Sequence, residues 1–217
     1  MTLRTEVIAC TRCPRLREHC AEVARVKRRA YRDESYWGRP IPRFGRADAR
    51  ALVLGLAPGN HGANRTGRVF TGDSSGDWLY RALYEHGFAN QPESTGRRDG
   101  LRLQDAAITC VVKCAPPQNK PNTSEIAACR PWLERELDAM RRLRVVIALG
   151  RIAFQGFLAV RPFAPRPDFS HGGRCEQDGI TLLTSYHPSR QNTNTKRLTK
   201  PMFDRVFRTA RTILGEP

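Results

Sequence analysis

The chain lacks the segments that would place it in a membrane or mark it for export. No apolar run approaches the roughly 18 residues of a membrane span, and the N-terminus MTLRTEVIAC has no signal-peptide core. There is also no internal repeat and no low-complexity block. With 217 residues, the chain is long enough for one substantial core. We therefore expect a compact, cytoplasmic protein whose residues 1–217 form a single domain.

Acidic residues are scarce relative to basic ones. Lys and Arg number 37 against 21 Asp and Glu, which gives a formal net charge of +16. Such an excess attracts polyanions, and nucleic acid is the partner that it favours. Much of the excess lies on stretches such as 130–144 that look like ordinary helix faces. Charge alone therefore gives only modest support for nucleic-acid binding.

The seven cysteines do not indicate a disulfide framework, because their number is odd and a reducing cytosol disfavours disulfides. Two pairs are distinctive instead. Cys10 and Cys13 are separated by two residues near the start, and Cys114 and Cys129 have fourteen residues between them. Four thiolates brought together by a fold are suitable ligands for an iron-sulfur cluster or a zinc ion.

The other three cysteines are weaker candidates. Cys110 lies in the apolar run AAITCVVKC and Cys175 follows the turn-like HGG, so both are expected to pack as small apolar residues. Cys20 follows Cys13 by seven residues and would share a helical face with it, which makes it a reserve ligand. Cys129 could also be only a packing residue on its helix.

Short apolar runs alternate with helical patterns along the chain. The apolar runs are rich in Val, Ile and Leu, as expected for strands buried on both faces. The expected strands are 51–56, 106–112, 145–149 and 181–185. The expected helices are 75–86, 124–142 with a capping box, 151–160 and 201–214. This alternation predicts an α/β fold with a mostly parallel sheet covered on both faces.

Unusual residues collect in the loops that follow these strands, 55–76, 113–121 and 186–199. None carries a phosphate fingerprint: no Lys-Ser or Lys-Thr follows the first glycines, and no G-x-G-x-x-G follows a strand. Nucleotide hydrolysis and dinucleotide binding therefore lose support. An aromatic ring among glycines, Phe70, together with polar side chains suits a flat ring such as a base removed from its stack.

Four segments in order, GLAPG, RTGRVFTGD, NKP and HPSRQN, resemble the motifs of the uracil-DNA glycosylase superfamily. More narrowly the chain resembles its iron-sulfur branch, called family five or type B, from Cys10 to the last helix. The resemblance implies a three-layer α/β/α sandwich with a central, mostly parallel four-stranded sheet. It also implies a monofunctional DNA glycosylase of base excision repair that hydrolyses the N-glycosidic bond of uracil and other modified bases.

The resemblance further implies a 4Fe-4S cluster of structural role. Its ligands would be Cys10, Cys13, Cys114 and Cys129. The implied partner is uracil-containing DNA, expected to be double-stranded, and the protein is expected to be a prokaryotic monomer near the nucleoid.

The resemblance assigns the substrate pocket to four residues. Phe70 would stack on the flipped base and Asn119 would hydrogen-bond the edge of uracil, because an amide offers both a donor and an acceptor. Ala57 and Gly59 belong to the first motif. Narrow uracil-specific relatives have a tyrosine at the position of Gly59 that excludes thymine, so a glycine there predicts a roomier pocket and broad specificity. Asn119 could instead be a turn residue before Lys-Pro.

Two residues are expected to carry catalysis. His187 would stabilise the negative charge that develops on the departing base. The best-known members of the superfamily have a water-activating acid where this chain has Ala57. Asp73, in FTGD, is therefore expected to activate water or stabilise the sugar cation. The alternative is that Asp73 only begins a helix.

DNA contacts are expected from the loop that contains HPSRQN. Arg190 and Gln191 would fill the gap left by the flipped nucleotide, and Lys196 and Arg197 would meet phosphates. Ser189, in the same motif, is also an expected DNA contact. Alternatively, this segment is only a solvated basic loop.

Two alternatives from other functional classes stay open. The missing acid at Ala57 is compatible with a catalytically weak module of the same fold that binds modified nucleic acid. Without the resemblance, a zinc-stabilised α/β nucleic-acid-binding protein would also fit the cysteines.

Overall fold

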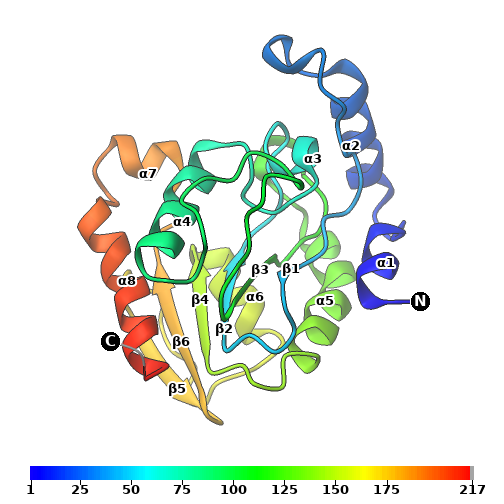
Figure 1. The fold of residues 1–217 in the computed structure, drawn as a ribbon. Coiled ribbons are helices and arrows are strands. Elements are labelled where there is room, and N and C mark those ends of the chain that lie inside the picture. Colours follow the sequence, from blue (N-terminus) through cyan, green and yellow to red (C-terminus); the bar gives the residue numbers. More distant parts are fainter. Residues whose placement is uncertain (216–217) are drawn as a thin grey trace.

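A computed structural model describes residues 1–215 as helices packed around one six-stranded sheet (Figure 1). The spatial order is β1 (Phe44–Gly45), β3 (Ala106–Cys110), β2 (Ala51–Gly55), β4 (Val145–Leu149), β6 (Ile180–Ser185) and β5 (Arg174–Gln177). The four inner strands run parallel, and both outer strands are antiparallel to their neighbours. The four predicted strands are thus confirmed.

The predicted strand count is wrong, because two edge strands add to the expected four. β1 has only two residues, too few for a recognisable apolar run. β5 alternates between exposed and half-buried positions and carries Arg, Glu and Gln, as is common on a sheet edge. Neither strand has the apolar composition by which buried strands are recognised.

Helices cover both faces of the sheet. One core lies between the sheet and α4 (Ser74–Glu85) and α8 (Lys200–Ile213), and it includes Val53 and Ile108. The other lies between the sheet and α1 (Leu3–Ile8), α2 (Pro14–Val26), α5 (Thr123–Asp138) and α6 (Arg151–Leu158), and it includes Leu52 and Leu54. Alternate residues of one strand therefore enter different cores, which gives the predicted three-layer sandwich.

The predicted helices are present with small shifts at their ends. The capping box of α5 forms, with the Asn122 N–H donating to Glu125 Oε2 at 2.7 Å. α5 ends four residues before the predicted end, yet Met140 still packs at 2 % exposure. A short helix, α7 (Arg190–Asn194), occupies part of the expected last loop, and Ser189 caps it.

Three further short helices complete the fold. They are η1 (Arg29–Tyr31), α3 (Ala63–Thr66) and η2 (Pro117–Asn119). Figure 1 shows α2, α3 and α7 at the same end of the molecule, beyond the carboxyl ends of the inner strands. None of the helices within residues 1–215 is long and apolar enough to cross a membrane.

Candidate active site and cysteine cavity

The loops at the carboxyl ends of β2, β3 and β6 enclose a cleft of about 560 Å³. Such a volume suits a small organic ligand, and this edge of a parallel sheet is where α/β proteins commonly bind ligands. The cleft brings together residues from all three predicted loops. The predicted site residues that line it are Ala57, Gly59, Phe70, Asp73, Asn119, His187, Ser189 and Arg190.

Asp73 is the N-cap of α4. Its Oδ1 accepts hydrogen bonds from the backbone N–H groups of Ser75 and Gly76, at 3.1 and 3.0 Å. These bonds satisfy donors that a helix start leaves free, and they fix the carboxylate. Asp73 therefore does begin a helix, as the alternative interpretation of the sequence held. Asp73 also lines the cleft, so both roles fit one side chain.

Two glycines make room for the second oxygen of Asp73. A Cβ on Gly62 would lie 2.2 Å from Asp73 Oδ2, and one on Gly59 would lie 3.0 Å from it. The first distance is a clash and the second is a tight contact. The loop after β2 therefore packs its backbone against the carboxylate, and larger residues there would displace it.

Phe70 is held between glycines in a conformation that non-glycine residues rarely adopt, with φ of 51°. A Cβ on Gly55 would lie 2.7 Å from its ring, and one on Gly76 would lie 1.8 Å from its carbonyl oxygen. The ring also stacks on His187, with the centroids 5.8 Å apart and the planes at 28°. Strained backbone of this kind is typical of binding sites.

His187 follows β6 and lines the cleft beside Phe70. Burial lowers its pKa, and the negative charge of Asp73 partly offsets that effect. The imidazole is therefore neutral at pH 7. Within residues 1–215 its ring nitrogens have no hydrogen-bond partner, while its carbonyl oxygen accepts from Asn192 Nδ2 at 2.8 Å. A neutral ring with an unused N–H can donate to a ligand.

Asn119 lies on the exposed rim of the cleft. It ends η2, and both Gln118 and Asn119 have positive φ, at 53° and 56°. Its backbone N–H donates to the carbonyl of Pro116 at 3.2 Å, and its side-chain amide makes no hydrogen bond within the described residues. The turn expected before Lys-Pro is thus present, and the amide is available to a ligand.

The predicted DNA contacts divide between the cleft and the surface beside it. Ser189 and Arg190 line the cleft, and Arg190 Nε donates to Ser74 Oγ at 3.2 Å. Gln191, Lys196 and Arg197 are exposed and do not line it. The Arg197 guanidinium lies 4.6 Å from the centre of the Tyr186 ring.

Sequence reasoning missed one wall of the cleft. Arg28, Tyr31, Asn60 and His61 line it, and the first two come from the segment between α2 and β1. His61 Nδ1 is 3.0 Å from the hydroxyl of Tyr36. The basic run VKRRAYR was the available signal, but nothing in the sequence shows that the chain returns to the cleft there.

The four predicted cysteine ligands line a second, smaller cavity between the N-terminal segment, the loop after β3 and α5. Trp132 Nε1 donates to Cys10 Sγ and the Lys113 N–H donates to Cys129 Sγ, both at 3.3 Å. Donors of this kind are typical around cluster sulfurs. The four cysteines and these donors therefore fit a cluster-binding site better than a role in apolar packing alone.

No set of three or more ligating side chains among the described residues is close enough to hold a single metal ion. A cluster is different, because each thiolate binds a different iron. Burial raises the pKa of Cys129 to about 11 and also raises that of Cys13. Without a metal these thiols are protonated, and bound iron would reverse that preference.

The remaining cysteines do not line the cysteine cavity. Cys110 is buried in the sheet core and Cys175 is half-buried on β5. Cys20 is fully buried and contacts both Cys114 and, at 3.5 Å, the carbonyl oxygen of Ala115. Cys20 therefore packs against one of the four predicted ligands without lining the cavity.

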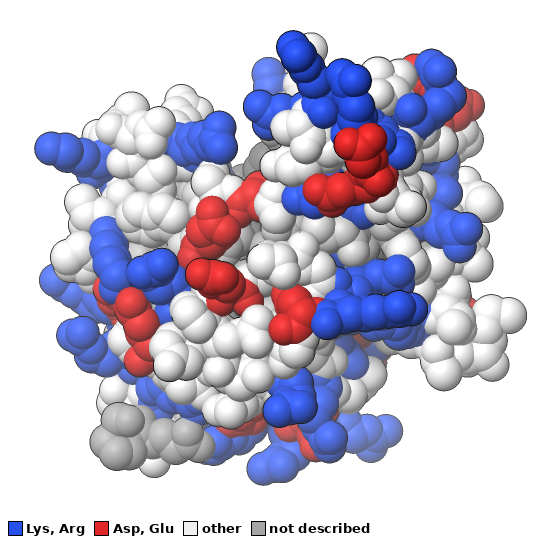
Figure 2. All heavy atoms as spheres, turned by 45° about the horizontal axis from the view of Figure 1, so that its top comes forward, with Lys and Arg blue, Asp and Glu red and all other residues white. Residues whose placement is uncertain are grey.

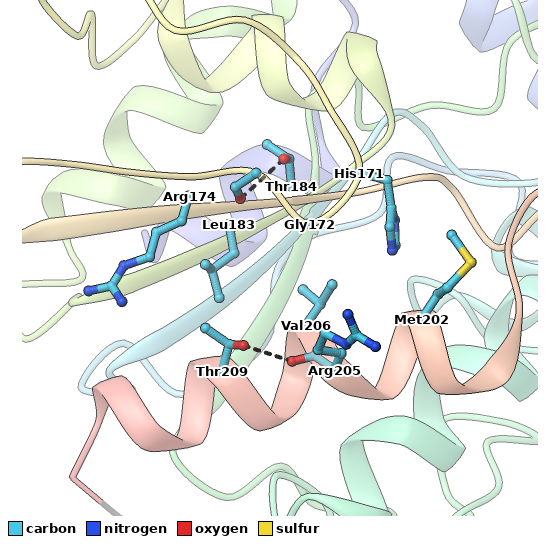
Figure 3. A pocket seen from close by; sticks show the side chains of 10 residues that line it. His171, Gly172, Arg174, Leu183, Thr184, Met202, Arg205, Val206 and Thr209 are labelled. Atoms are coloured by element: carbon cyan, nitrogen blue, oxygen red, sulfur yellow. Dashed lines mark hydrogen bonds between the residues drawn. The ribbon is translucent and has the colours of Figure 1, made fainter.

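A further cavity of about 430 Å³ lies between α8 and the end of β6 (Figure 3). Figure 3 shows His171 and Arg205 on opposite sides of it. His171 Nδ1 accepts a hydrogen bond from the Tyr186 N–H at 3.2 Å, so this side chain holds the loop against β6. No predicted site residue lines this cavity.

Comparisons with known proteins agree with this geometry. The chain is 49% identical over 211 residues to the type-5 uracil-DNA glycosylase of Thermus thermophilus, covering 95% of this chain and 94% of that protein. It is 48% identical over 217 residues to the one of Mycobacterium tuberculosis, covering 98% of this chain and 81% of that protein. The type-5 enzyme of Pyrobaculum aerophilum is 44% identical over 204 residues, with 94% and 88% covered.

The family model of the uracil DNA glycosylase superfamily matches residues 42–211, which include β2 to β6, all eight predicted residues of the cleft, and two of the four cysteines. The other two cysteines lie before the matched residues, in the part of the chain that the type-5 relatives share. By its motifs, its fold and these relatives, the chain belongs to the uracil DNA glycosylase superfamily.

Proposed function

We propose that this protein is a DNA repair glycosylase that hydrolyses the N-glycosidic bond of uracil in DNA and also removes larger modified bases. One observation carries the proposal. The cleft joins a carboxylate, a neutral imidazole, an aromatic ring and a side-chain amide, which come from three loops far apart in the sequence. These are the groups needed to hold a flipped base and to cleave its bond to the sugar.

The base would enter against the ring of Phe70, which stacks on the ring of His187. The Asn119 amide on the rim can donate to one group and accept from another along the Watson-Crick edge of uracil. Because the backbone around Phe70 is fixed by glycines, this surface is preformed. Preorganisation of that kind lowers the entropy cost of binding.

Bond cleavage leaves positive charge on the sugar and negative charge on the base. As the bond between C1′ and the base nitrogen breaks, its electron pair leaves with the base. The unused N–H of neutral His187 would donate to the developing oxyanion. Asp73 would stabilise the sugar cation and take a proton from the water that adds to C1′. The base then leaves after gaining a proton from solvent.

Broad specificity follows from the wall formed by Gly59. Gly59 has no side chain that could exclude a carbon-5 substituent of a pyrimidine, and the side chain nearest to it is the Asp73 carboxylate. Uracil, 5-hydroxymethyluracil, hypoxanthine and ethenocytosine are the proposed substrates. Normal thymine in a Watson-Crick pair is spared because unpairing it costs more than unpairing a mismatched base.

The 4Fe-4S cluster is proposed for the cysteine cavity. Cys10, Cys13, Cys114 and Cys129 would hold it, and its bonds would cross-link the N-terminal segment to the loop that leads to Asn119. Cys114 precedes Asn119 by only five residues, so anchoring Cys114 would restrain the loop that carries Asn119. The proposal includes no redox step. We also propose that the substrate is double-stranded DNA and that the protein acts as a monomer in a prokaryotic cytoplasm.

The test is release of free base from duplex DNA that carries one uracil opposite guanine, measured under single-turnover conditions. Parallel duplexes carry 5-hydroxymethyluracil, hypoxanthine or ethenocytosine. We expect free uracil and an abasic site, with release of at least one larger base. Tight binding of these duplexes without base release would refute the activity and support a binding module. Release of uracil alone would refute the broad specificity.

A further inference from the structure

The segment 25–39 forms a raised part of the molecule beside the cleft, and we call it the arm. It comprises the end of α2, η1 and the chain that leads towards β1. We propose that the arm is a second DNA-binding wall, which contacts the sugar-phosphate backbone across the cleft from α7. The inference rests on the proposed function, because it takes DNA as the ligand of the cleft.

The arm reaches the cleft through Arg28 and Tyr31, which line it together with Arg190 of α7. The Arg28 guanidinium forms no ion pair within residues 1–215. The pKa of His61 is lowered by burial and further by the charges of Arg28 and Arg65. Uncompensated positive charge therefore lies at the cleft, where the phosphates that flank a flipped nucleotide would pass.

The rest of the arm is also basic, and of its basic residues only Arg25 forms an ion pair within residues 1–215, with Glu22 of α2. It carries six Lys or Arg residues and two carboxylates, and one of these, Glu34, pairs with Arg65 of α3. Lys27 donates to the carbonyl oxygen of Arg32 at 3.0 Å. Arg29 and Arg32 are exposed and have no ion pair among the described residues. The arm therefore presents a group of arginines to solvent.

Figure 2 shows Lys and Arg side chains on two raised parts of the surface, with a hollow between them. The arm contributes basic residues from one end of the sequence, and from the other end come Arg190 of α7 and, just after this helix, Lys196 and Arg197. A groove with positive charge on both sides matches a duplex, whose two backbones are both negative. An acidic protein would not require the same charges to line the cleft of the flipped base, so DNA is the favoured ligand.

The arm is anchored to α3 and to the loop that precedes it. Arg65 lies 4.0 Å from the centre of the Tyr31 ring. The Tyr36 hydroxyl contacts His61 Nδ1 at 3.0 Å, and the Trp37 N–H donates to the Arg65 carbonyl at 2.9 Å. This wall exists before DNA binds, so binding does not require the arm to become ordered.

The experiment measures binding of a fluorescent duplex with one tetrahydrofuran abasic analogue, which a glycosylase cannot cleave. The dissociation constant is measured against salt concentration for the wild type and for Arg28→Gln/Arg29→Gln/Arg32→Gln. The plot of log K against log salt becomes shallower by about 0.9 for each phosphate that the protein no longer neutralises, so we expect the slope to decrease in magnitude by roughly 2 to 3. The affinity at low salt should fall with it.

Two matched triples serve as controls. Arg141→Gln/Arg142→Gln/Arg144→Gln removes the same charge just before the amino end of β4, whereas the cleft lies at the carboxyl ends of the strands. This variant should keep the wild-type slope. Arg28→Lys/Arg29→Lys/Arg32→Lys keeps the charge and should keep most of the slope. If the arm triple melts at a lower temperature, Arg29→Gln alone replaces it, because Arg29 is exposed and lies outside the cleft.

A wild-type slope in the glutamine triple would overturn the proposal, as would an equal loss in the lysine triple. An effect of the same size in the control near β4 would also overturn it, because the loss would then reflect net charge. The duplex is not cleaved, so binding tests the arm independently. A protein that binds it with the expected slopes and yet releases no uracil refutes the proposed activity alone.

Discussion

The cleft and the cysteine cavity are both assembled from distant segments, but they are stabilised in different ways. In the cleft, backbone amides fix Asp73 and glycines fix Phe70. In the cysteine cavity, two sulfurs accept one hydrogen bond each, from Trp132 and the Lys113 N–H. The cleft is therefore preformed by the protein chain itself. The cysteine cavity depends far more on what its sulfurs bind.

Lys113 lines the cysteine cavity and begins the loop that leads to Asn119. Its backbone N–H faces Cys129, while its ammonium, fully buried, donates at 2.7 Å to Glu136 Oε2 and at 2.6 Å to Thr109. The sheet side of the cysteine cavity is thus held by an ion pair that has almost no contact with solvent. Substitutions of Glu136 and of Cys129 therefore test two different contributions to the stability of the cysteine cavity.

The largest effect is expected from Cys129→Ser. The loss of one ligand should prevent binding of the proposed iron-sulfur cluster, remove its visible absorption and lower the melting temperature, because metal binding contributes to folding free energy. Cys175→Ser is the matched control, since Cys175 is half-buried on the edge strand β5. Iron content and absorption spectra are the measurements. A brown Cys129→Ser protein with full iron would contradict the ligand assignment.

Glu136→Gln should destabilise the protein by about 3 to 5 kcal/mol, because it leaves the buried Lys113 charge without its partner. Denaturant unfolding of the purified protein measures this loss. Glu134→Gln is the control on the same helix, since Glu134 forms no ion pair within the described residues. Equal stability of the two variants would show that the pair contributes little to this wall.

In the cleft, Asp73→Asn should lower the rate of uracil release by about 100-fold or more. Its side-chain oxygen can still cap α4, so the fold should be retained. Asp77→Asn removes the same charge one turn along α4 and should keep the wild-type rate, as Asp77 does not line the cleft. Affinity for an abasic duplex should not change in either variant. An active Asp73→Asn enzyme would rule out the charge as the catalytic feature.

The packing of glycines on Asp73 predicts a graded series. An added methyl group is 2.2 Å from Oδ2 at Gly62 and 3.0 Å at Gly59, and it meets nothing within 4 Å at Gly96. Release of uracil should therefore fall most in Gly62→Ala, several-fold in Gly59→Ala, and not in Gly96→Ala. Gly59→Ala should also reduce 5-hydroxymethyluracil release more than uracil release. Three equal rates would refute the packing argument.

The smallest effect concerns pH. Burial lowers the pKa of His187 below its ordinary value of 6.5, so the unfolded chain binds a proton more readily than the folded one. The contribution of His187 to the free energy of unfolding should be fully present above pH 6.5. It should decrease as the pH drops from 6.5 towards the pKa of His187 in the folded protein. His187→Gln should make the melting temperature less dependent on pH in that range. An unchanged pH dependence would contradict the shift.

Much of the fold could be predicted because its parallel strands are buried on both faces. A run such as VVIAL at 145–149 has one explanation, whereas β5, with Arg174 and Glu176, has the composition of a loop. The cleft residues could be predicted because they lie in motifs that directly follow the strands. Loops after parallel strands converge at the carboxyl ends of those strands. Arg28 and Tyr31 were missed because their position depends on contacts with α3, which no local pattern reveals.

The N-cap position of Asp73 has a consequence for the evolution of the active site. A helix start favours a short polar side chain such as Asp, Asn or Ser at this position, so folding alone holds the Asp73 side chain at the cleft wall whether or not it takes part in chemistry. With Ala57 in the first motif, Asp73 is the one acidic residue among the described residues that line the cleft. Catalysis would have inherited a residue that was already fixed in place.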